Sequence, residues 1–255
     1  MTEHRISYAV ASGVARLTLD NPSGRNAIDR HFVDAFVDYA QRCAEDSSVK
    51  VIVLAANGDF FSVGGDLAEF LHREADIENY IRNLARTFHA GVGYLHRAPA
   101  PIVLALRGIA AGGGFSLVCG ADIVIAARSA KLTSAYTRTG LTPDGGATYF
   151  LPRIVGHRKA FEIAALNPVL TAEEAKALGI VTDVVEESQL DAAVEKLVAQ
   201  MARIPSGALV ELKEQLRRSA NCSLEEQLSR EADGIARQAG KPETIACLHE
   251  FFRAE

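Results

Sequence analysis

The hydrophobic pattern along the chain predicts a mixed α/β core followed by helices. Continuous apolar runs at residues 51–55 and 102–106 are typical of strands buried on both faces. Apolar residues at helical spacing predict amphipathic helices at 29–44 and 77–95. From residue 190 onward the pattern is helical only, with an apolar terminal helix at 245–252. The remaining expected elements are strands at 14–19, 123–126, 131–133 and 180–185, and a helix at 150–165 interrupted near Pro152 and Gly156.

Two capping boxes predict where later helices begin. In Thr171-Ala172-Glu173-Glu174 and in Ser223-Leu224-Glu225-Glu226 a hydroxyl residue precedes a glutamate by three positions. The first box opens a helix that we expect to end at Gly179. The helices of the tail are rich in Leu and Phe, and they pack either on the same chain or on a neighbouring subunit.

Composition and charge narrow the class of protein. The 255 residues, 48% of them hydrophobic and 23% charged, are typical of one large globular domain or a domain with a small appendage. A formal charge of −5 without a long basic run gives no electrostatic support for binding nucleic acid or a membrane surface. The four cysteines form no C-x-x-C pair, which argues against a metal site or disulfide framework. Residues 1–10 have no apolar signal core, so we expect a cytoplasmic protein.

Two glycine-rich turns are the first candidates for chemistry. Gly112, Gly113 and Gly114 follow the predicted strand at 102–106, and Gly64 and Gly65 follow the one at 51–55. Glycines are costly in backbone entropy, so a run of them needs a reason. A tight turn with close helix packing is one reason; a helix start whose N–H groups face a ligand is another. Because the same construction occurs twice, we favour two N–H groups aimed at one point, as in an oxyanion hole.

Several common catalytic motifs are missing from the sequence. It contains no G-x-x-x-x-G-K-[ST], no H-E-x-x-H and no G-x-S-x-G. The glycine triplet does not fit the dinucleotide-binding pattern G-x-G-x-x-G. Ser116 follows the triplet but has no obvious His–Asp partners, which argues against a nucleophilic serine.

At the two turns the sequence resembles a known family. F-S-V-G-G-D-L and G-I-A-A-G-G-G-F are similar to the paired signatures of the enoyl-CoA hydratase/isomerase (crotonase) superfamily, and the resemblance extends over residues 17–251. It implies an α/β crotonase-like spiral of ββα repeats at 1–190 and a C-terminal helical trimerisation region at 191–255. It also implies a homotrimer or dimer of trimers, and an acyl-CoA substrate with coenzyme A as part of the thioester and no other cofactor.

The resemblance also assigns roles to individual residues. Gly65 and Gly113 match the two residues whose N–H groups hold the thioester oxygen. Asp66 matches a residue beside coenzyme A, although it is equally suited to be a helix N-cap. The positions that match the coenzyme A lining are Arg25, Ala27, Ser62, Gly64, Gly65, Asp66 and Leu67. The acyl pocket is expected to be walled by residues 68–79 and by the tail.

The chain departs from the family pattern at the two glutamates that hydratases use to split water. Ser116 and Tyr136 occupy those places, and neither a hydroxyl nor a phenol replaces a carboxylate base at neutral pH. Asp144 remains, in Thr142-Pro143-Asp144-Gly145-Gly146, where turn composition is one explanation. Its position also matches the catalytic aspartate of dienoyl-CoA and ring-1,2-epoxyphenylacetyl-CoA isomerases. One carboxylate suffices to shift a double bond, so the isomerase function is favoured.

Other functions stay open at this level. In the related 4-chlorobenzoyl-CoA dehalogenases an aspartate matching Asp144 attacks the ring, a histidine matching His89 activates water, and an aromatic residue occupies the place of Tyr136. His89 lies beside the apolar stripe of its helix, where a structural histidine is the ordinary expectation. Conventional hydration, thioester hydrolysis and a non-catalytic acyl-CoA-binding paralogue are the remaining alternatives.

Overall fold

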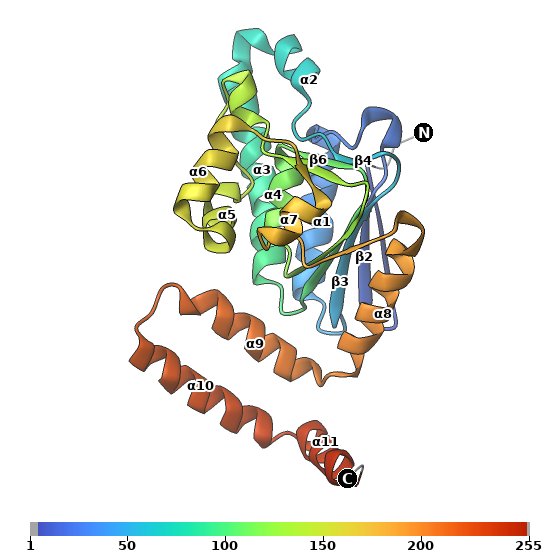
Figure 1. Ribbon diagram of the computed structural model, residues 1–255, viewed down its shortest axis with the longest axis vertical. Coiled ribbons are helices and arrows are strands. Elements are labelled where there is room, and N and C mark those ends of the chain that lie inside the picture. The colour runs from blue at the N-terminus through green and yellow to red at the C-terminus, as the bar shows by residue number, and fades with distance from the viewer. Residues whose placement is uncertain (1–4, 254–255) are drawn as a thin grey trace.

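The computed structural model describes residues 5–253 and builds them around two β-sheets (Figure 1). Residues 1–4 and 254–255, the ends of the two predicted regions, lie outside the described residues. The larger sheet has the order β1-β2-β3-β5-β7-β10 and the smaller has the order β4-β6-β8-β9. The strands are β1 (Ile6–Ala11), β2 (Val14–Leu19), β3 (Val51–Ala56), β4 (Phe60–Ser62), β5 (Ile102–Leu106), β6 (Ile109–Ala111), β7 (Ile123–Ala127), β8 (Lys131–Thr133), β9 (Leu170–Thr171) and β10 (Asp183–Val185).

Strand pairs and helices alternate along the core. In the pairs β3–β4, β5–β6 and β7–β8 the first strand joins the larger sheet and the second joins the smaller one. Parallel pairing of β3 with β5 and of β5 with β7 stacks these units in order. The helices are α1 (Arg30–Glu45), α2 (Leu67–His72), α3 (Ile77–Arg97), α4 (Gly113–Cys119), α5 (Ala147–Val155), α6 (His157–Leu166), α7 (Ala172–Ala177), α8 (Leu190–Arg203), α9 (Ser206–Ser219), α10 (Leu224–Ala239) and α11 (Pro242–Arg253).

The larger sheet is covered on both faces, which explains the continuous apolar runs of β3 and β5. Ile52, Leu54 and Leu104 belong to the main core with α1, α3 and α4. Val51 and Val53 face the other way and pack with Val103 against α8. The predicted strands at 51–55 and 102–106 are therefore confirmed, and α4 between the sheets is buried throughout.

Two predicted elements differ from the observed ones in where they begin or end. The helical stretch at 150–165 breaks at Gly156, which has φ +77°, whereas Pro152 lies within α5. The strand predicted at 180–185 is formed only at Asp183–Val185. Its first residues are not extended because the N–H groups of Ile180 and Val181 both donate to the carbonyl oxygen of Ala175 at the end of α7. Both predicted capping boxes are confirmed, with reciprocal bonds in Thr171–Glu174 and in Ser223–Glu226.

The last three helices extend away from the core (Figure 1). The sequence-based division at residue 190 falls at the start of α8, which packs on the sheet, whereas α9 and α11 bury none of their residues. Lys213 ties α9 to the core through Asp122 at 2.8 Å and the carbonyl oxygen of Ala100 at 3.0 Å. Within residues 5–253 no helix is long and apolar enough to cross a membrane.

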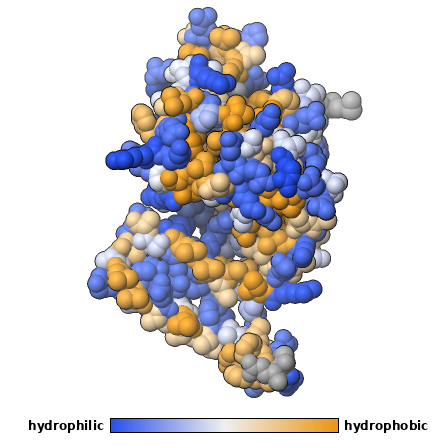
Figure 2. Space-filling view, viewed as in Figure 1, coloured by the Kyte–Doolittle hydropathy of each residue, from blue (hydrophilic) through white to orange (hydrophobic). Residues whose placement is uncertain are grey.

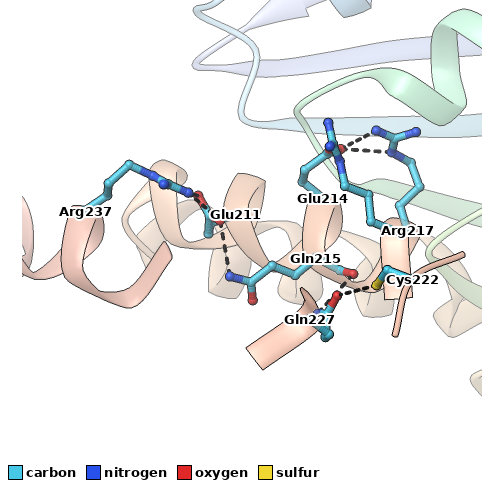
Figure 3. A network of polar contacts seen from close by, with 8 residues as sticks. Glu211, Glu214, Gln215, Arg217, Cys222, Gln227 and Arg237 are labelled. Atoms are coloured by element: carbon cyan, nitrogen blue, oxygen red, sulfur yellow. Dashed lines mark hydrogen bonds and ion pairs between the residues drawn. The ribbon is translucent and has the colours of Figure 1, made fainter. Parts of the chain in front are cut away.

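Polar contacts join the helices of the tail to one another (Figure 3). Arg237 of α10 donates to the Glu211 carboxylate of α9 at 3.0 Å, and Gln227 of α10 donates to the carbonyl oxygen of Gln215 at 3.5 Å. Glu214 binds Arg217 at 2.6 Å and also contacts Arg218, both on its own helix. These pairs lie in contact with solvent, so each contributes little stability.

Helix packing between α1 and α3 allows a test of the core. A Cβ atom added at Gly91 would lie 2.5 Å from Cδ1 of buried Phe36, so Gly91→Ala should lower the free energy of unfolding by about 1–3 kcal/mol. Gly93 lies on the same helix, and its added Cβ would meet only the flexible end of Arg97. Gly93→Ala should therefore stabilise the protein by about 0.5–1 kcal/mol. Urea unfolding of both variants measures the difference, and equal effects would contradict the packing described.

Candidate active site

The two predicted glycine turns lie in direct contact. β4 and β6 are parallel neighbours, so the turn that leaves each strand emerges at the same edge of the small sheet. Gly64 has φ +83°, and a Cβ atom there would lie 2.9 Å from the backbone nitrogen of Gly113. A Cβ atom at Gly114 would lie 2.6 Å from the carbonyl oxygen of Ser62. Glycine is needed at these positions because the two backbones leave no room for a side chain.

The N–H groups at these turns differ in whether they have a protein partner. Gly64 donates to Ser62 Oγ, Asp66 to the Ile28 carbonyl, and Gly112 to the Ser134 carbonyl. The N–H groups of Gly65 and Gly113 make no hydrogen bond within residues 5–253, and both residues line one cavity. Backbone amides aimed into a shared cavity are suited to hold an oxyanion.

Asp144 reaches the same cavity from the loop after η3 (Tyr136–Thr139). Its Oδ1 accepts a hydrogen bond from the Tyr136 hydroxyl at 2.6 Å, and its Oδ2 lies 3.2 Å from His89 Nε2. The side chain is 33% exposed. The sequence-predicted residues Asp144, Tyr136, His89, Gly65 and Gly113 are therefore brought together, from elements far apart in the chain.

Tyr136 and Ser116 fix the position of Asp144. Burial, with the neighbouring Asp144 carboxylate second, raises the pKa of Tyr136, so the phenol stays protonated and donates. Ser116 is fully buried, and its hydroxyl lies 2.8 Å from the Asp144 carbonyl oxygen and 2.9 Å from the Tyr136 hydroxyl. Neither the Tyr136 phenol nor the Ser116 hydroxyl is available as a base. Of these three residues, Asp144 is the one that lines the cavity with a basic side chain.

His89 comes from α3 and is 46% exposed. Its neighbour Phe88 is buried in the core, which explains why the sequence alone favoured a structural histidine. The Gly145 N–H donates to His89 Nε2 at 3.1 Å, so the ring is held to the Asp144 loop by backbone as well as side-chain contacts.

The cavity has a volume of about 420 Å³ and a mostly apolar lining. Phe70 is the one contribution from the wall predicted at 68–79. In the described part of a single chain the tail, predicted as a second wall, contributes no lining residue, because its helices extend from the end of the core opposite α2 (Figure 1). The other lining side chains include Ile28, Leu67, Ile81, Leu84, Phe88, Arg138, Leu141 and Thr142.

No metal centre is formed by the described residues. Among residues 5–253 the structure contains no cluster of three or more His, Cys, Asp or Glu side chains arranged to hold a metal ion.

The residues expected to line coenzyme A divide into two groups. Arg25, Asp66 and Leu67 are at least partly exposed, and Asp66 caps α2 by accepting from the N–H groups of Ala68 and Glu69. Ala27 is partly buried beside them. Ser62 and Gly64 are buried, and the Ser62 hydroxyl donates to the Asn26 carbonyl while accepting from Gly64. Ser62 therefore supports the turn.

Asn26 is a supporting residue that the sequence analysis did not assign. It is buried with φ +51°, and its side-chain amide donates to the carbonyl oxygens of Asn57 and Phe60. Its Oδ1 accepts from the Asn21 N–H at 2.8 Å. The signal in the sequence is weak, since an asparagine after Pro-Ser-Gly-Arg is ordinary loop composition, although Asn tolerates a left-handed backbone.

Comparisons with known proteins agree with this geometry. The sequence pattern of the enoyl-CoA hydratase/isomerase family matches residues 9–251. An enoyl-CoA hydratase structure from Mycobacterium smegmatis superposes with a TM-score of 0.92 at 28% identity, covering 99% of this chain and 98% of that one. A protein of Rhodobacter capsulatus named as an enoyl-CoA hydratase is 33% identical and covers 91% of this chain and 88% of its own.

Relatives named for other reactions match equally well. The 1,2-epoxyphenylacetyl-CoA isomerase of Escherichia coli is 32% identical, over 94% of this chain and 92% of its own. A 4-chlorobenzoyl coenzyme A dehalogenase of an Arthrobacter species is 29% identical, over 98% and 91%. The fold is that of a crotonase-type enzyme. The chain belongs to the enoyl-CoA hydratase/isomerase family, as its two glycine turns predicted, and the crotonase fold expected from the sequence is confirmed.

The Asn26 contacts give a test of how the site is supported. Asn26→Ala leaves the Asn21 N–H and the carbonyls of Asn57 and Phe60 without their partner, so unfolding should be easier by about 2–4 kcal/mol. Asn57→Ala removes one exposed contact with Asp20 and should cost well under 1 kcal/mol. Urea denaturation of the two variants measures this contrast. A small effect at Asn26 would show that water replaces its bonds.

Proposed function

We propose that this protein shifts a carbon–carbon double bond, or isomerises a related unsaturated group, in a coenzyme A thioester. One observation carries the proposal: two unbonded backbone N–H groups and a single carboxylate line the same apolar cavity. A double-bond shift requires a base that removes a proton and returns it elsewhere, and a site that stabilises the charge on the carbonyl oxygen between the steps.

In the proposed reaction Asp144 carries the proton and the two N–H groups hold the thioester oxygen. Asp144 takes a proton from a carbon of the acyl chain, and the electron pair of the broken C–H bond moves through the conjugated system to the thioester oxygen. The N–H groups of Gly65 and Gly113 hold that oxygen while it is negative. The electron pair then returns, the proton is delivered from Asp144 to a different carbon, and the double bond has moved.

The supporting residues favour isomerisation over hydration. Addition of water in this family employs two carboxylates, and their places here hold Ser116 and Tyr136. Ser116 is fully buried and Tyr136 donates to Asp144, so neither can activate water. The name of the Rhodobacter relative points to hydration and that of the Escherichia relative to isomerisation. The polar groups of this chain agree better with the second.

Binding of the coenzyme A part is also a proposal. Arg25 is exposed and has φ +54°, and its guanidinium lies 5.5 Å from the ring centre of Phe60. An arginine held in this way beside the two turns is suited to bind phosphate groups. We assign Ala27, Gly64, Asp66 and Leu67 to the same binding region, with Ser62 acting through Gly64.

A second candidate is hydrolytic dehalogenation of an aromatic acyl-CoA. The observation that favours it is the contact of His89 Nε2 with Asp144 Oδ2 at 3.2 Å, next to Tyr136. In that reaction Asp144 would attack the ring carbon and His89 would activate the water that releases the product. Oxygen from water enters this product, and none enters an isomerisation product.

The Asp144 assignment is tested by Asp144→Asn. Turnover should fall by about 10²–10⁴-fold, because the amide cannot take a proton, while calorimetric binding of the thioester changes little. Asp59→Asn, outside the cavity, is the matched control. Incubating 3-enoyl-, 2-enoyl- and 4-halobenzoyl-CoA in heavy-oxygen water with mass detection identifies the reaction. A moved double bond at unchanged mass supports isomerisation, whereas labelled product, or full turnover by Asp144→Asn, contradicts it.

We further propose that the chain assembles as a homotrimer or a dimer of trimers. The tail carries many exposed apolar side chains, visible as orange patches in Figure 2, and a monomer rarely leaves such a surface uncovered. They are Val210, Leu212, Leu216, Leu224, Leu228, Ile235, Ile245, Leu248, Phe251 and Phe252.

Light scattering tests the assembly. The wild-type mass should be three or six times the 27.3 kDa of one chain. Replacing Leu228 and Ile235 of α10 with Glu should release smaller species, because both side chains are more than half exposed in the single chain. Val10→Glu on β1 is the control. A monomeric wild-type protein would contradict this proposal and leave the chemistry unaffected.

A further inference from the structure

One nitrogen atom of His89 has two neighbours with opposite requirements. The Gly145 N–H lies 3.1 Å from Nε2 and can only donate, so it needs a lone pair on that atom. Asp144 Oδ2 lies 3.2 Å from the same Nε2, and an ionised carboxylate can only accept, so it needs a proton there. A ring nitrogen carries either a lone pair or a proton, and the two contacts cannot both be hydrogen bonds while Asp144 is ionised.

A proton added to the pair allows the His89–Asp144 contact to become a hydrogen bond. A protonated Asp144 donates to the Nε2 lone pair and shares it with the Gly145 N–H, whereas a protonated Nε2 donates to Oδ2 and no longer accepts from Gly145. An acyl-CoA that has just given its proton to Asp144 brings about this condition. The geometry therefore suits a proton that moves between Oδ2 and Nε2 during the reaction.

The other side of the carboxylate is closed to proton transfer. Oδ1 accepts from the Tyr136 hydroxyl at 2.6 Å, and burial raises the pKa of this phenol, so it gives up its proton reluctantly. Behind it lies Ser116, which is fully buried. His89 is nearly half exposed, which connects Oδ2 to solvent. The Asp144 carboxylate is itself 33% exposed and lines the cavity. When the acyl group fills that cavity, His89 is the outlet for its proton among the described side chains that contact the carboxylate.

We propose that His89 is a proton-exchange residue through which Asp144 loses the abstracted hydrogen to water before the acyl group is reprotonated. The inference rests on the proposed isomerase function and adds to it that the hydrogen returned to the substrate comes from solvent. His89 acts through Asp144 and needs no contact with the acyl group.

The steps balance without any further reactant. The substrate C–H bond breaks and an O–H bond forms on Asp144, while the electron pair moves to the thioester oxygen. The Asp144 O–H bond then breaks as an N–H bond forms on Nε2, giving an imidazolium and a carboxylate. Water exchanges the hydrogen on Nε2 for one of its own. The new hydrogen returns by the same path to Asp144 and then to the other carbon.

The test measures the origin of the hydrogen rather than the rate. We would use trans-3-hexenoyl-CoA in deuterium oxide at low conversion, follow the conjugated product by its absorbance, and determine its deuterium content by mass spectrometry. His89→Gln is the variant, because the glutamine side-chain oxygen can still accept from Gly145 but takes up no proton. His96→Gln is the control, since His96 lies two turns further along α3 and does not line the cavity. Asp144→Asn gives the background of spontaneous exchange.

We expect most wild-type and His96→Gln product molecules to carry one solvent deuterium. The His89→Gln product should lose most of that label, because its hydrogen then comes from the substrate itself. A label content in His89→Gln equal to that of the wild type overturns the inference. So does wild-type isomerisation without solvent deuterium, which does not depend on how well the variant folds. A wild-type protein that moves no double bond in this probe contradicts the proposed function instead.

Discussion

The contact between the backbones of two strand-to-helix turns is the constraint on which the site depends. β4 and β6 pair in parallel, and the turns that follow them approach so closely that Gly64 leaves no room for a Cβ atom beside Gly113. The amides of Gly64, Asp66 and Gly112 are bonded within the protein, and those of Gly65 and Gly113, which line the cavity, make no hydrogen bond within residues 5–253. The oxyanion site that we propose would therefore follow from sheet pairing, with side chains in a supporting part.

Helix α4 connects this amide pair to the carboxylate. Gly113 is its first residue, and Ser116, one turn later, reaches the carbonyl oxygen of Asp144. A helix that is buried throughout cannot move independently of its surroundings, so the distance between the amides and Asp144 is fixed by packing. Ser116 therefore connects the loop that carries Asp144 to the helix that begins at Gly113.

Much of the site could be predicted because its residues have distinct local signals. The glycine runs, the two capping boxes and Asp144 in a Pro-Asp-Gly-Gly turn are visible in the sequence, and the structure brings Asp144 into contact with Tyr136 and His89. The role of Asn26 was not visible, because its partners Asn57 and Phe60 are some 30 residues away. The late start of the strand predicted at 180–185 has a local cause: the N–H groups of Ile180 and Val181 bond to Ala175 at the end of α7, and these bonds outweigh an apolar run.

The composition of the tail left open whether it packs on the same chain or on a neighbouring subunit. Its apolar residues are mostly exposed, and α9 is tied to the core by Lys213, whose side chain is only 12% exposed. Lys213 binds Asp122 and the Ala100 carbonyl, while Asp122 also accepts from the Ile102 N–H at the start of β5. A partly buried ion pair of this kind adds little net stability but disfavours other orientations. The direction of α9 is therefore set from the start of β5, and β5 is followed by β6, the strand that leads to Gly112 and Gly113. This links the placement of the exposed apolar helices to the part of the fold that builds the site.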